Sequence, residues 1–503
     1  MKIIEHKSGI SSNLNLIFIL PLALSVLTGF AFGLGLGEWI LLITFIACLF
    51  SFMLVGSLPW IILLVILSLS VWSFPQISIY FGFKAFPLGE IGLILVGVPF
   101  LIRALANGKF RIRSKFSFLF LLYAVIFVLA IVRSPIPSFS RFALDGSKEI
   151  YNFLIIILFY FVITNLVTSE RHLILFLRGL FWGAFVGVLL SLFILIFTPS
   201  SNALITFSGV GYPNYGFSGL DSVLLTTTLN VHNLYPTYAA ILGLTLLWTF
   251  NSKIVRGNKK NIIGIIFLAA ILSGSRSGII GFFAIIIFYS LIRRNQSTVL
   301  KLVFTIVTII VLLTVFINLD STSNLAIQAR RTFSFSFMGS NVASDSIRRR
   351  FVVWSAILKG AEGNPITWLM GQGVGSYLRV VGKSLGFTVP EDAINFGLVS
   401  SHSLFFDAFL VIGILGLLVV IAMFIVAILN AVRLYRMESI STINRSGEWL
   451  LLLLIYVIVT SIAGGGLNSV PIALPIILTS VIASLANMFS KDSIMINVLE
   501  EKS

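Results

Sequence analysis

The residues of this chain that could carry chemistry are arginines and one histidine that interrupt long apolar stretches. Arg276 stands in a turn of serines and glycines, Arg350 ends a run of three arginines, and His402 lies between two serines. The guanidinium group is a planar fork of donors that matches phosphate oxygens. A neutral imidazole can take a proton from a hydroxyl, because its unperturbed pKa is about 6.5. These residue types predict a phosphate site and a general base.

The composition predicts that a membrane must position these residues. Of the 503 residues, 58% are hydrophobic and only 10% are charged. Such values exclude a soluble globular enzyme, a disordered tail and a fibrous repeat, and they are typical of a polytopic membrane protein. The formal net charge of +16 fits the basic loops that membrane proteins collect on the cytoplasmic side. We therefore expect no nucleic-acid partner.

Hydropathy predicts an all-α polytopic membrane protein. Fourteen apolar segments occur, of which the pair 262–274 and 277–292 is short for two full spans, so we expect 12–14 transmembrane segments. The segments are 14–34, 38–55, 58–74, 88–106, 116–132, 150–167, 173–198, 233–251, 262–274, 277–292, 300–318, 404–433, 447–463 and 470–489.

Loop charge orients these segments with both termini in the cytoplasm. The basic clusters at 109–115, 253–260, 293–294 and 433–436 then all fall on the inner side, as the positive-inside rule requires. One large loop, residues 318–401, then faces outward. This loop is basic on the side where basic residues are not expected to accumulate, which indicates either a translocated loop whose charge carries no meaning or a phosphate site.

Residues 346–360 of this loop read as an amphipathic helix. Ile347, Phe351, Trp354 and Leu358 form one apolar stripe. The spacing predicts that Arg348 and Arg350 flank the stripe and that Arg349 points away from it. Two interpretations stay open: an interfacial helix whose arginines touch lipid phosphates, or a helix that places Arg350 and Arg348 on a ligand pyrophosphate.

Three further motifs have both a structural and a functional interpretation. Gly371-x-Gly373-x-Gly375 is a weak dinucleotide signal and fits better a flexible or anion-cradling turn. His402 is either a helix cap or a general base, with Asp407 as a helix-start acid or an orienting partner. Arg276 either reaches outer headgroups or points inward at an anion.

The stretch from His232 and Asn233 to Tyr235 begins another apolar segment on the outer side, where it either binds sugar or caps a helix. Motifs of metal-dependent or nucleotide chemistry, such as DxD, HExxH, a Walker loop or GxSxG, do not occur in the sequence. We therefore expect no metal and no cofactor. An outer-face reaction would then need a donor that arrives already activated, and a lipid-linked pyrophosphate sugar meets that requirement.

The order of these pieces resembles the O-antigen ligase and Wzy-type polymerase superfamily. The matching elements are Ser273 to Gly278 around Arg276, Arg350-x-x-x-Trp354, Asn364-Pro365 with the glycine triplet, Ser401-His402-Ser403, and Gly413 to Gly416 in the next apolar run. The resemblance covers roughly residues 200–435. It predicts three parts: N-terminal transmembrane helices 1–199, a ligase- or polymerase-like core 200–435 that includes the loop 318–401, and C-terminal helices with a tail, 436–503.

The resemblance implies a GT-C-like membrane fold and metal-independent glycan transfer from an undecaprenyl-diphosphate carrier on the outer face of the inner membrane. It implies Arg276 and Arg350 on the donor pyrophosphate and His402 near the acceptor hydroxyl. The substrate-binding set that we expect beside them is Arg348, Arg349, His232, Asn233, Tyr235 and Trp354. Many members have Asn where this chain has Ser403, which leaves the role of that neighbour open.

The predicted function is that of an inverting polysaccharide polymerase. Its partners are the lipid-linked oligosaccharide, a glycan acceptor, membrane lipids and other polysaccharide-assembly proteins. A ligase that transfers the glycan to lipid A core differs only in the acceptor. A transporter or flippase of lipid-linked sugars and a non-catalytic scaffold are the alternatives of other classes.

Overall fold

The structure is a computed structural model. All the residues that it describes belong to one compact unit within residues 64–503. The predicted helices 14–34, 38–55 and 58–74, nearly all of 300–318, and the loop 199–231 lie outside the described residues. The described ranges are 78–80, 85–108, 110, 116–134, 141–197, 234–250, 262–266, 276–293, 307, 342–384, 401, 403–437, 441–462 and 470–500.

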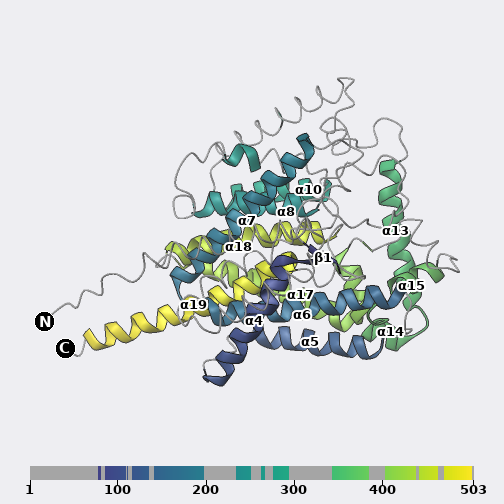
Figure 1. The fold of residues 1–503 in the computed structure, drawn as a ribbon, viewed down its shortest axis with the longest axis horizontal. Helices are drawn as coiled ribbons and strands as arrows, with labels where there is room; N and C mark the ends of the chain where they lie inside the picture. The colour runs from purple at the N-terminus through teal and green to yellow at the C-terminus, as the bar shows by residue number, and fades with distance from the viewer. Residues whose placement is uncertain are drawn as a thin grey trace, which may run out of the picture. The chain divides into compact units, whose positions relative to one another are not determined.

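Helices dominate this part of the chain (Figure 1). Their order with the two short strands is β1 (Ser78–Tyr80), β2 (Ala85–Pro87), α4 (Leu88–Ala106), α5 (Phe116–Val132), α6 (Arg141–Leu166), α7 (Glu170–Phe197), α8 (Leu234–Phe250), α10 (Arg276–Arg293), α13 (Val342–Ala361), α14 (Pro365–Met370), α15 (Tyr377–Ser384), α17 (Leu404–Tyr435), α18 (Ser441–Ile462) and α19 (Val470–Glu500).

The helix bounds confirm most of the predicted apolar segments in this part of the chain. Helices α4 and α5 begin and end where hydropathy predicts, and α7, α8 and α10 differ from the prediction by at most three residues at either end. Among the described residues, three helices are long and apolar enough to cross a membrane: Glu149–Leu166, Leu404–Tyr435 and Thr442–Ile462. The chain is therefore a helical membrane protein, and the total of 12–14 spans and the GT-C likeness remain predictions.

One element departs from the all-α prediction. Strands β1 and β2 form an antiparallel pair in which Ser78 lies opposite Pro87 and Ile79 opposite Phe86. The two strands are three residues each, too short for an alternating pattern to be visible in the sequence. Aromatic and β-branched residues favour such pairing, and Pro87 is tolerated because it ends the ladder.

Helix α18 lies at the centre of the described bundle. It packs against α8, α10, α17 and α19, and 72% of its most apolar stretch is buried inside the protein. Trp449 and Tyr456 are among its fully buried side chains. A helix that is apolar all round and contacts helices on every side is an interior helix.

Helix α17 instead divides its surface between protein and hydrocarbon. Exposed leucines and isoleucines recur along one side at helical spacing, namely Leu415, Leu418, Ile421, Ile425 and Leu429. Lipid satisfies such a stripe in a membrane protein, whereas water would not. The opposite side packs on α18, α5 and α19.

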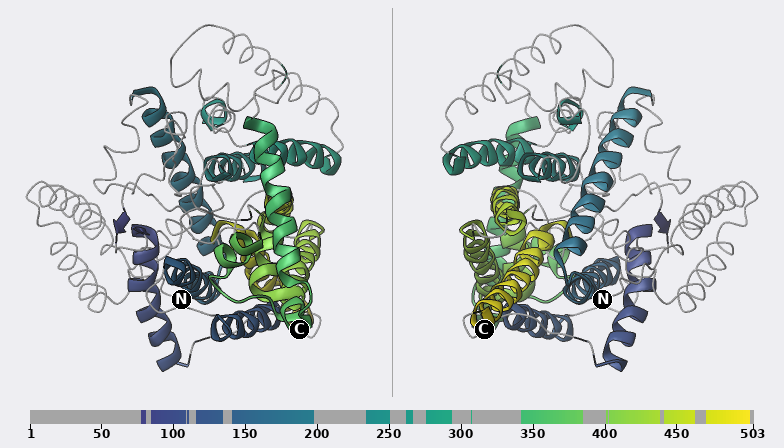
Figure 2. Two further views of the ribbon diagram at one scale, coloured as in Figure 1. Left: turned by 90° about the vertical axis from the view of Figure 1, so that its right-hand side faces the viewer. Right: turned by 90° about the vertical axis from the view of Figure 1, so that its left-hand side faces the viewer.

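The three helices α13, α14 and α15 gather at the N-terminal end of α17, as two further directions of view make plain (Figure 2). Asn364 begins α14: its Oδ1 atom accepts hydrogen bonds from the amides of Ile366 and Thr367, with Pro365 in the first turn. This is the usual chemistry of a helix start. The predicted Asn-Pro motif is thus a helix cap.

Candidate functional site

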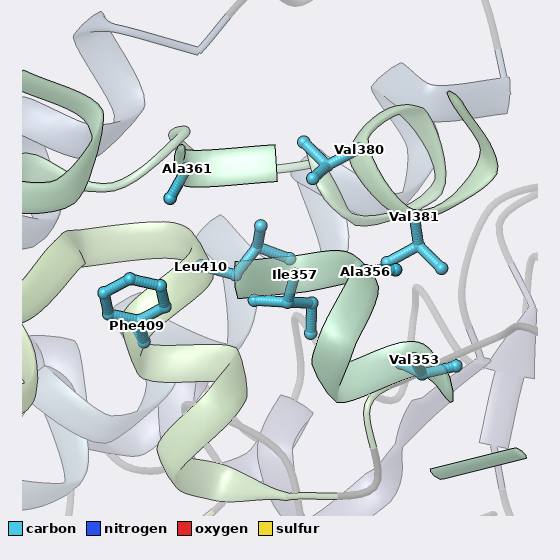
Figure 3. Packing of buried hydrophobic residues seen from close by; sticks show 8 residues of the cluster. All are labelled: Val353, Ala356, Ile357, Ala361, Val380, Val381, Phe409 and Leu410. Carbon is cyan, nitrogen blue, oxygen red and sulfur yellow. The ribbon is translucent and has the colours of Figure 1, made fainter. Parts of the chain in front are cut away.

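Residues 342–384, here named the docking segment, pack onto the first turns of α17. Val353, Ala356, Ile357 and Ala361 of α13, with Val380 and Val381 of α15, surround Phe409 and Leu410 of α17 (Figure 3). All eight side chains are buried. This apolar cluster fixes the docking segment against the point where the chain returns to the membrane bundle.

The buried face of α13 differs from the predicted apolar stripe. Phe351 and Leu358 of that stripe are 62% and 39% exposed, whereas Val353 and Ile357 are almost fully buried. Apolar residues occur on two sides of this helix, so periodicity alone could not decide which side meets α17. Trp354 lies at the border between them, and Arg350 precedes it by one turn on the same side of the helix.

A break in α17 receives the chain of the docking segment. Gly413 has φ 69° and ψ −170° inside the helix, a conformation that essentially only glycine adopts. The break removes the intrahelical donors that would normally bond the preceding turn. Instead, the carbonyl of Leu410 accepts a hydrogen bond from the Gln372 amide at 2.6 Å, and that of Val411 accepts one from the Gly373 amide at 3.1 Å.

The expectation of an anion-cradling turn at 371–375 is wrong, because the amides of this glycine loop have partners within the protein. Besides the two bonds to α17, the Val374 amide donates to the carbonyl of Ala130 on α5. The Gly375 amide donates to the carboxylate of Glu149 on α6 at 3.1 Å. The loop therefore joins α5, α6 and α17 and leaves these amides unable to hold a phosphate.

Trp354 ties α13 to the residue before His402. Its indole N–H donates to the carbonyl of Ser401 at 2.9 Å, and its ring stacks on Phe406 with centroids 4.8 Å apart and planes at 8°. Both the polar edge and one face of the indole are therefore used inside the protein. Trp354 was predicted to bind substrate, and the geometry gives it a positioning contact as well.

We expect Trp354→Phe to reduce the rate of any reaction that depends on His402 without unfolding the chain. Phenylalanine keeps the stacking surface but removes the N–H donor, which leaves the Ser401 carbonyl without that bond and frees the 401–403 turn. A loss of about tenfold in turnover is expected for such a misplacement. Steady-state kinetics with the unfolding temperature as control would measure it, and unchanged turnover would remove the positioning role.

The serines on either side of His402 are fully buried and hydrogen-bonded. Ser401 and Ser403 are 0% and 1% exposed. The Ser401 hydroxyl donates to the Ser403 carbonyl at 2.9 Å and accepts from the Ser403 amide at 3.0 Å. The carboxylate of Asp407, in the first turn of α17, lies close to Ser401. The two residues that flank the histidine in the sequence are thus held in place.

Tyr377, the first residue of α15, faces the same carboxylate. Its hydroxyl is buried and makes no hydrogen bond with any described residue. Burial raises the pKa of this hydroxyl above its ordinary value, and the negative charge of Asp407 raises it further. Tyr377 therefore stays protonated at physiological pH and can act as a donor but not as a base.

Three other helix ends meet beside this turn. The Ser403 hydroxyl donates to the carbonyl of Ser461 at the end of α18, at 3.4 Å. One and a half turns earlier on α18, the Tyr456 ring lies 5.9 Å from that of Tyr238 in the first turns of α8. The same ring closely approaches Gly281, near the start of α10, where a Cβ atom would lie 2.8 Å from it.

These contacts bring several of the predicted motifs to one end of the bundle. The first turns of α8 and α10, which carry the motifs of Tyr235 and Arg276, begin there, as does α17 after His402. The hydroxyls of Tyr456 and Ser461 are buried there without a hydrogen bond to any described residue. That this end faces the outer side of the membrane remains a prediction.

The predicted site residues are covered to different degrees. Arg350 and Trp354 are partly exposed neighbours on α13, and Arg350 has interactions within the protein. For Arg276, Arg348, Arg349 and Tyr235 the structure describes the helical backbone alone. His402, His232 and Asn233 lie outside the described residues. Their roles remain predictions.

Sequence reasoning missed Tyr377 and Glu149, and it named Ser401 only as part of the histidine motif. Each of the three interacts with a residue that is distant in the sequence: Tyr377 with Asp407, Ser401 with Trp354, and Glu149 with Gly375. Only the serines that flank the histidine gave a local signal. No group of three or more histidine, cysteine, aspartate or glutamate side chains that could hold a metal ion occurs within the described residues.

The fold and this site define an integral membrane protein whose inner helices carry a buried polar cluster at one end. Residues 262–421 match the Wzy_C family model, which is described as O-antigen ligase. The match confirms the resemblance to the O-antigen ligase and Wzy-type superfamily for this part of the chain, which includes α10, the docking segment and the first half of α17. No curated protein matches the chain closely enough to count as a relative.

The family is glycosyltransferase-like and comprises O-antigen ligase- and polymerase-type membrane enzymes, which act on lipid-linked glycans and their acceptors. Membrane helices and family together indicate an integral protein of the inner membrane.

Proposed function

We propose that the chain transfers a glycan from undecaprenyl diphosphate to a hydroxyl of an acceptor sugar on the outer face of the inner membrane. The observation that carries this proposal is the hydrogen bond between Trp354 and Ser401. It joins the helix of Arg350 to the turn of His402, within the part of the chain that matches the family model. This contact supports the proposal that a phosphate-binding side chain and a base share one small site.

The donor half of the reaction follows from the chemistry of arginine. When the bond between the anomeric carbon and the phosphate oxygen breaks, its electron pair leaves with undecaprenyl diphosphate. Fixed guanidinium groups at Arg350 and Arg276 stabilise the charge that grows on the departing oxygens. A diphosphate is already a good leaving group, so neither a general acid nor a metal is needed in this proposal.

The acceptor half uses the imidazole of His402. The acceptor oxygen attacks the anomeric carbon from the side opposite the diphosphate, so the configuration inverts. The proton of the hydroxyl passes to the imidazole and from there to water. The proposal is supported by the neighbours of this histidine in the sequence, Ser401 and Ser403, which are both buried and hydrogen-bonded.

The proposal has two versions, which differ only in the molecule that accepts the glycan. Our first candidate is a polymerase, in which the acceptor is another lipid-linked repeat. The second is a ligase, in which the acceptor is lipid A core; the matched family comprises enzymes of both types.

Product size tests both versions. Purified protein in liposomes receives a lipid-linked repeat, with and without lipid A core. A ladder from the repeat alone supports the polymerase, and a product that requires the core supports the ligase. Movement of an intact lipid-linked sugar across the bilayer, with no covalent product, would replace both by a transporter.

We expect Arg350→Lys to slow transfer by roughly tenfold to a hundredfold, because a point charge does not replace a bidentate fork on a diphosphate. Arg350→Gln should reduce the rate further. Arg379→Lys is the matched control, since Arg379 is exposed on α15 and should retain wild-type kinetics. The measurement is the initial transfer rate together with donor affinity. Wild-type donor affinity in Arg350→Lys would identify a merely lipid-facing arginine.

A further inference from the structure

Arg133 lies at the C-terminal end of α5, where the glycine loop crosses it. The Val374 amide donates to the carbonyl of Ala130 at 3.3 Å, and the Ser134 hydroxyl donates to the carbonyl of Val374 at 2.5 Å. Gly373 approaches so closely that a Cβ atom there would lie 3.0 Å from the backbone of Ser134. Arg133 stands between the two residues that hold the loop, Ala130 in the last turn of α5 and Ser134 just beyond its end.

The guanidinium group of Arg133 lacks a partner at one of its nitrogens. Its Nη1 atom is buried and makes no hydrogen bond with any described residue. A guanidinium group carries its charge at every pH in the physiological range and has five N–H donors. Withdrawing such a donor from water without a partner is strongly unfavourable, so the arrangement predicts an anionic acceptor that binds at this position.

The groups around Arg133 do not supply that anion. Glu149 accepts the Gly375 amide at the same loop, and within the described residues no side chain, Glu149 included, accepts a hydrogen bond from Nη1 of Arg133. An arginine that merely reaches lipid headgroups extends its guanidinium group away from the protein, whereas Nη1 of Arg133 is enclosed by protein atoms. The side chain as a whole is only partly exposed.

We propose that Arg133, at the junction of α5 with the glycine loop, binds a phosphate group of a lipid. Phosphate is the anion whose oxygens match the guanidinium fork, and the end of an apolar membrane helix is the level at which lipid phosphates lie. The inference does not rest on glycan transfer. Two sources present the same chemistry, a polyprenyl diphosphate and an anionic phospholipid headgroup, and the experiment below distinguishes them.

The site is separate in sequence from the arginines of the proposed donor site. Arg133 directly follows the last residue of α5, outside the residues that match the family model, whereas Arg350 belongs to α13. The glycine loop connects the two regions, because it leads directly into α15 and Tyr377. A phosphate bound at Arg133 would therefore contact the helix end that holds the docking segment in place.

The test measures how lipids stabilise the full chain in detergent. Undecaprenyl diphosphate, phosphatidylglycerol and undecaprenol are titrated separately, and the unfolding temperature gives the apparent affinity. We expect phosphate-bearing lipid to stabilise the protein and undecaprenol, which lacks phosphate, to have no effect. Arg133→Gln should weaken the affinity at least about tenfold, with Arg133→Lys in between. Arg379→Gln, at an exposed arginine, should behave as wild type.

Each variant is also made together with Arg350→Gln, which removes the proposed donor contact. If lipid still raises the unfolding temperature of Arg350→Gln but no longer raises that of the double variant with Arg133→Gln, the lipid binds at Arg133. This conclusion holds whether or not the chain transfers glycans. A preference for undecaprenyl diphosphate identifies the carrier as the source, and a preference for phosphatidylglycerol identifies the headgroup.

Arg133→Met provides a second test of the proposal in case Arg133→Gln folds poorly. Because the change removes a buried charge that has an unpartnered donor, the ligand-free unfolding temperature of Arg133→Met should equal or exceed that of wild type. Wild-type lipid affinity in the Arg133 variants would overturn the proposal. A lower ligand-free unfolding temperature in both Arg133→Met and Arg133→Gln would also overturn it, since Arg133 would then serve the fold.

Discussion

His402→Ala is expected to lower the rate of glycan transfer by about a hundredfold to ten-thousandfold, the range that a positioned general base contributes. The affinity for the lipid-linked donor should stay near that of wild type, because the proposed diphosphate contacts come from arginines. The measurement is single-turnover transfer in liposomes, with donor binding determined separately.

The pH dependence of the wild-type rate gives an independent test of the same residue. Protonation of the imidazole removes its capacity to accept the hydroxyl proton, so the rate should fall as the solution becomes more acidic. The residual rate of His402→Ala should lack that acidic limb.

His172→Ala is the matched control. The His172 ring contacts the Leu166 carbonyl and the Thr168 hydroxyl, at the start of α7 on the predicted cytoplasmic side. It should retain turnover within about twofold of wild type, as expected away from a catalytic centre. Near-wild-type turnover in His402→Ala would exclude the histidine from the mechanism.

Gly413→Ala is expected to destabilise the protein by roughly 3 kcal/mol or more and to abolish transfer. Two effects add. The residue has φ 69°, which an alanine adopts only with strain. In addition, a Cβ atom would lie 2.4 Å from the Gly371 nitrogen and from the Leu369 oxygen. Since these are backbone atoms, the glycine loop would have to leave α17.

The reciprocal change Gly371→Ala should have the same effect, because its Cβ atom would lie 2.5 Å from the backbone of Val411 and of Gly413. Gly363→Ala is the control for backbone strain alone. Gly363 has φ 79°, but nothing lies within 4 Å of its Cβ position, so a loss of only about 1 kcal/mol is expected.

Thermal unfolding in detergent and the transfer rate would be measured for all three glycine variants. If Gly413→Ala and Gly371→Ala were no less stable than Gly363→Ala, the close crossing of loop and helix would not be what holds the docking segment.

The transmembrane helices were predictable because their signal is local. Long apolar runs fix α4, α5 and α17 within a few residues, since an apolar run of this length has few alternatives to a buried or spanning helix. The early extension of α6 to Arg141 was missed, because its first turns carry charged and polar residues that hydropathy assigns to a loop.

The packing of the docking segment was only partly predictable. Periodicity gave the helix at 346–360, but Phe351 and Val353 are both apolar and lie on different sides of it. Only the presence of α17 decides that Val353 is buried and Phe351 exposed. Likewise, the glycine triplet indicated a turn. Its hydrogen bonds to α17 could not be predicted, because they depend on the break at Gly413, which follows about 40 residues later in the sequence.

The site itself depends on contacts between distant residues. The order of apolar segments predicts that Arg350 and His402 lie on the same side of the membrane. It does not predict the hydrogen bond between Trp354 and Ser401, because these residues are 47 positions apart in the sequence. Tyr377 gave no signal, because a tyrosine after a glycine loop is ordinary until Asp407 is found opposite it.

The most direct test of the proposed function follows both halves of the donor in one assay. Purified wild-type protein in liposomes is given a lipid-linked oligosaccharide whose diphosphate and glycan carry different labels. The proposal predicts that free undecaprenyl diphosphate and glycosylated acceptor appear in equal amounts, and that both disappear in His402→Ala. A donor whose sugar–phosphate bond stays intact while the lipid crosses the bilayer would contradict glycan transfer.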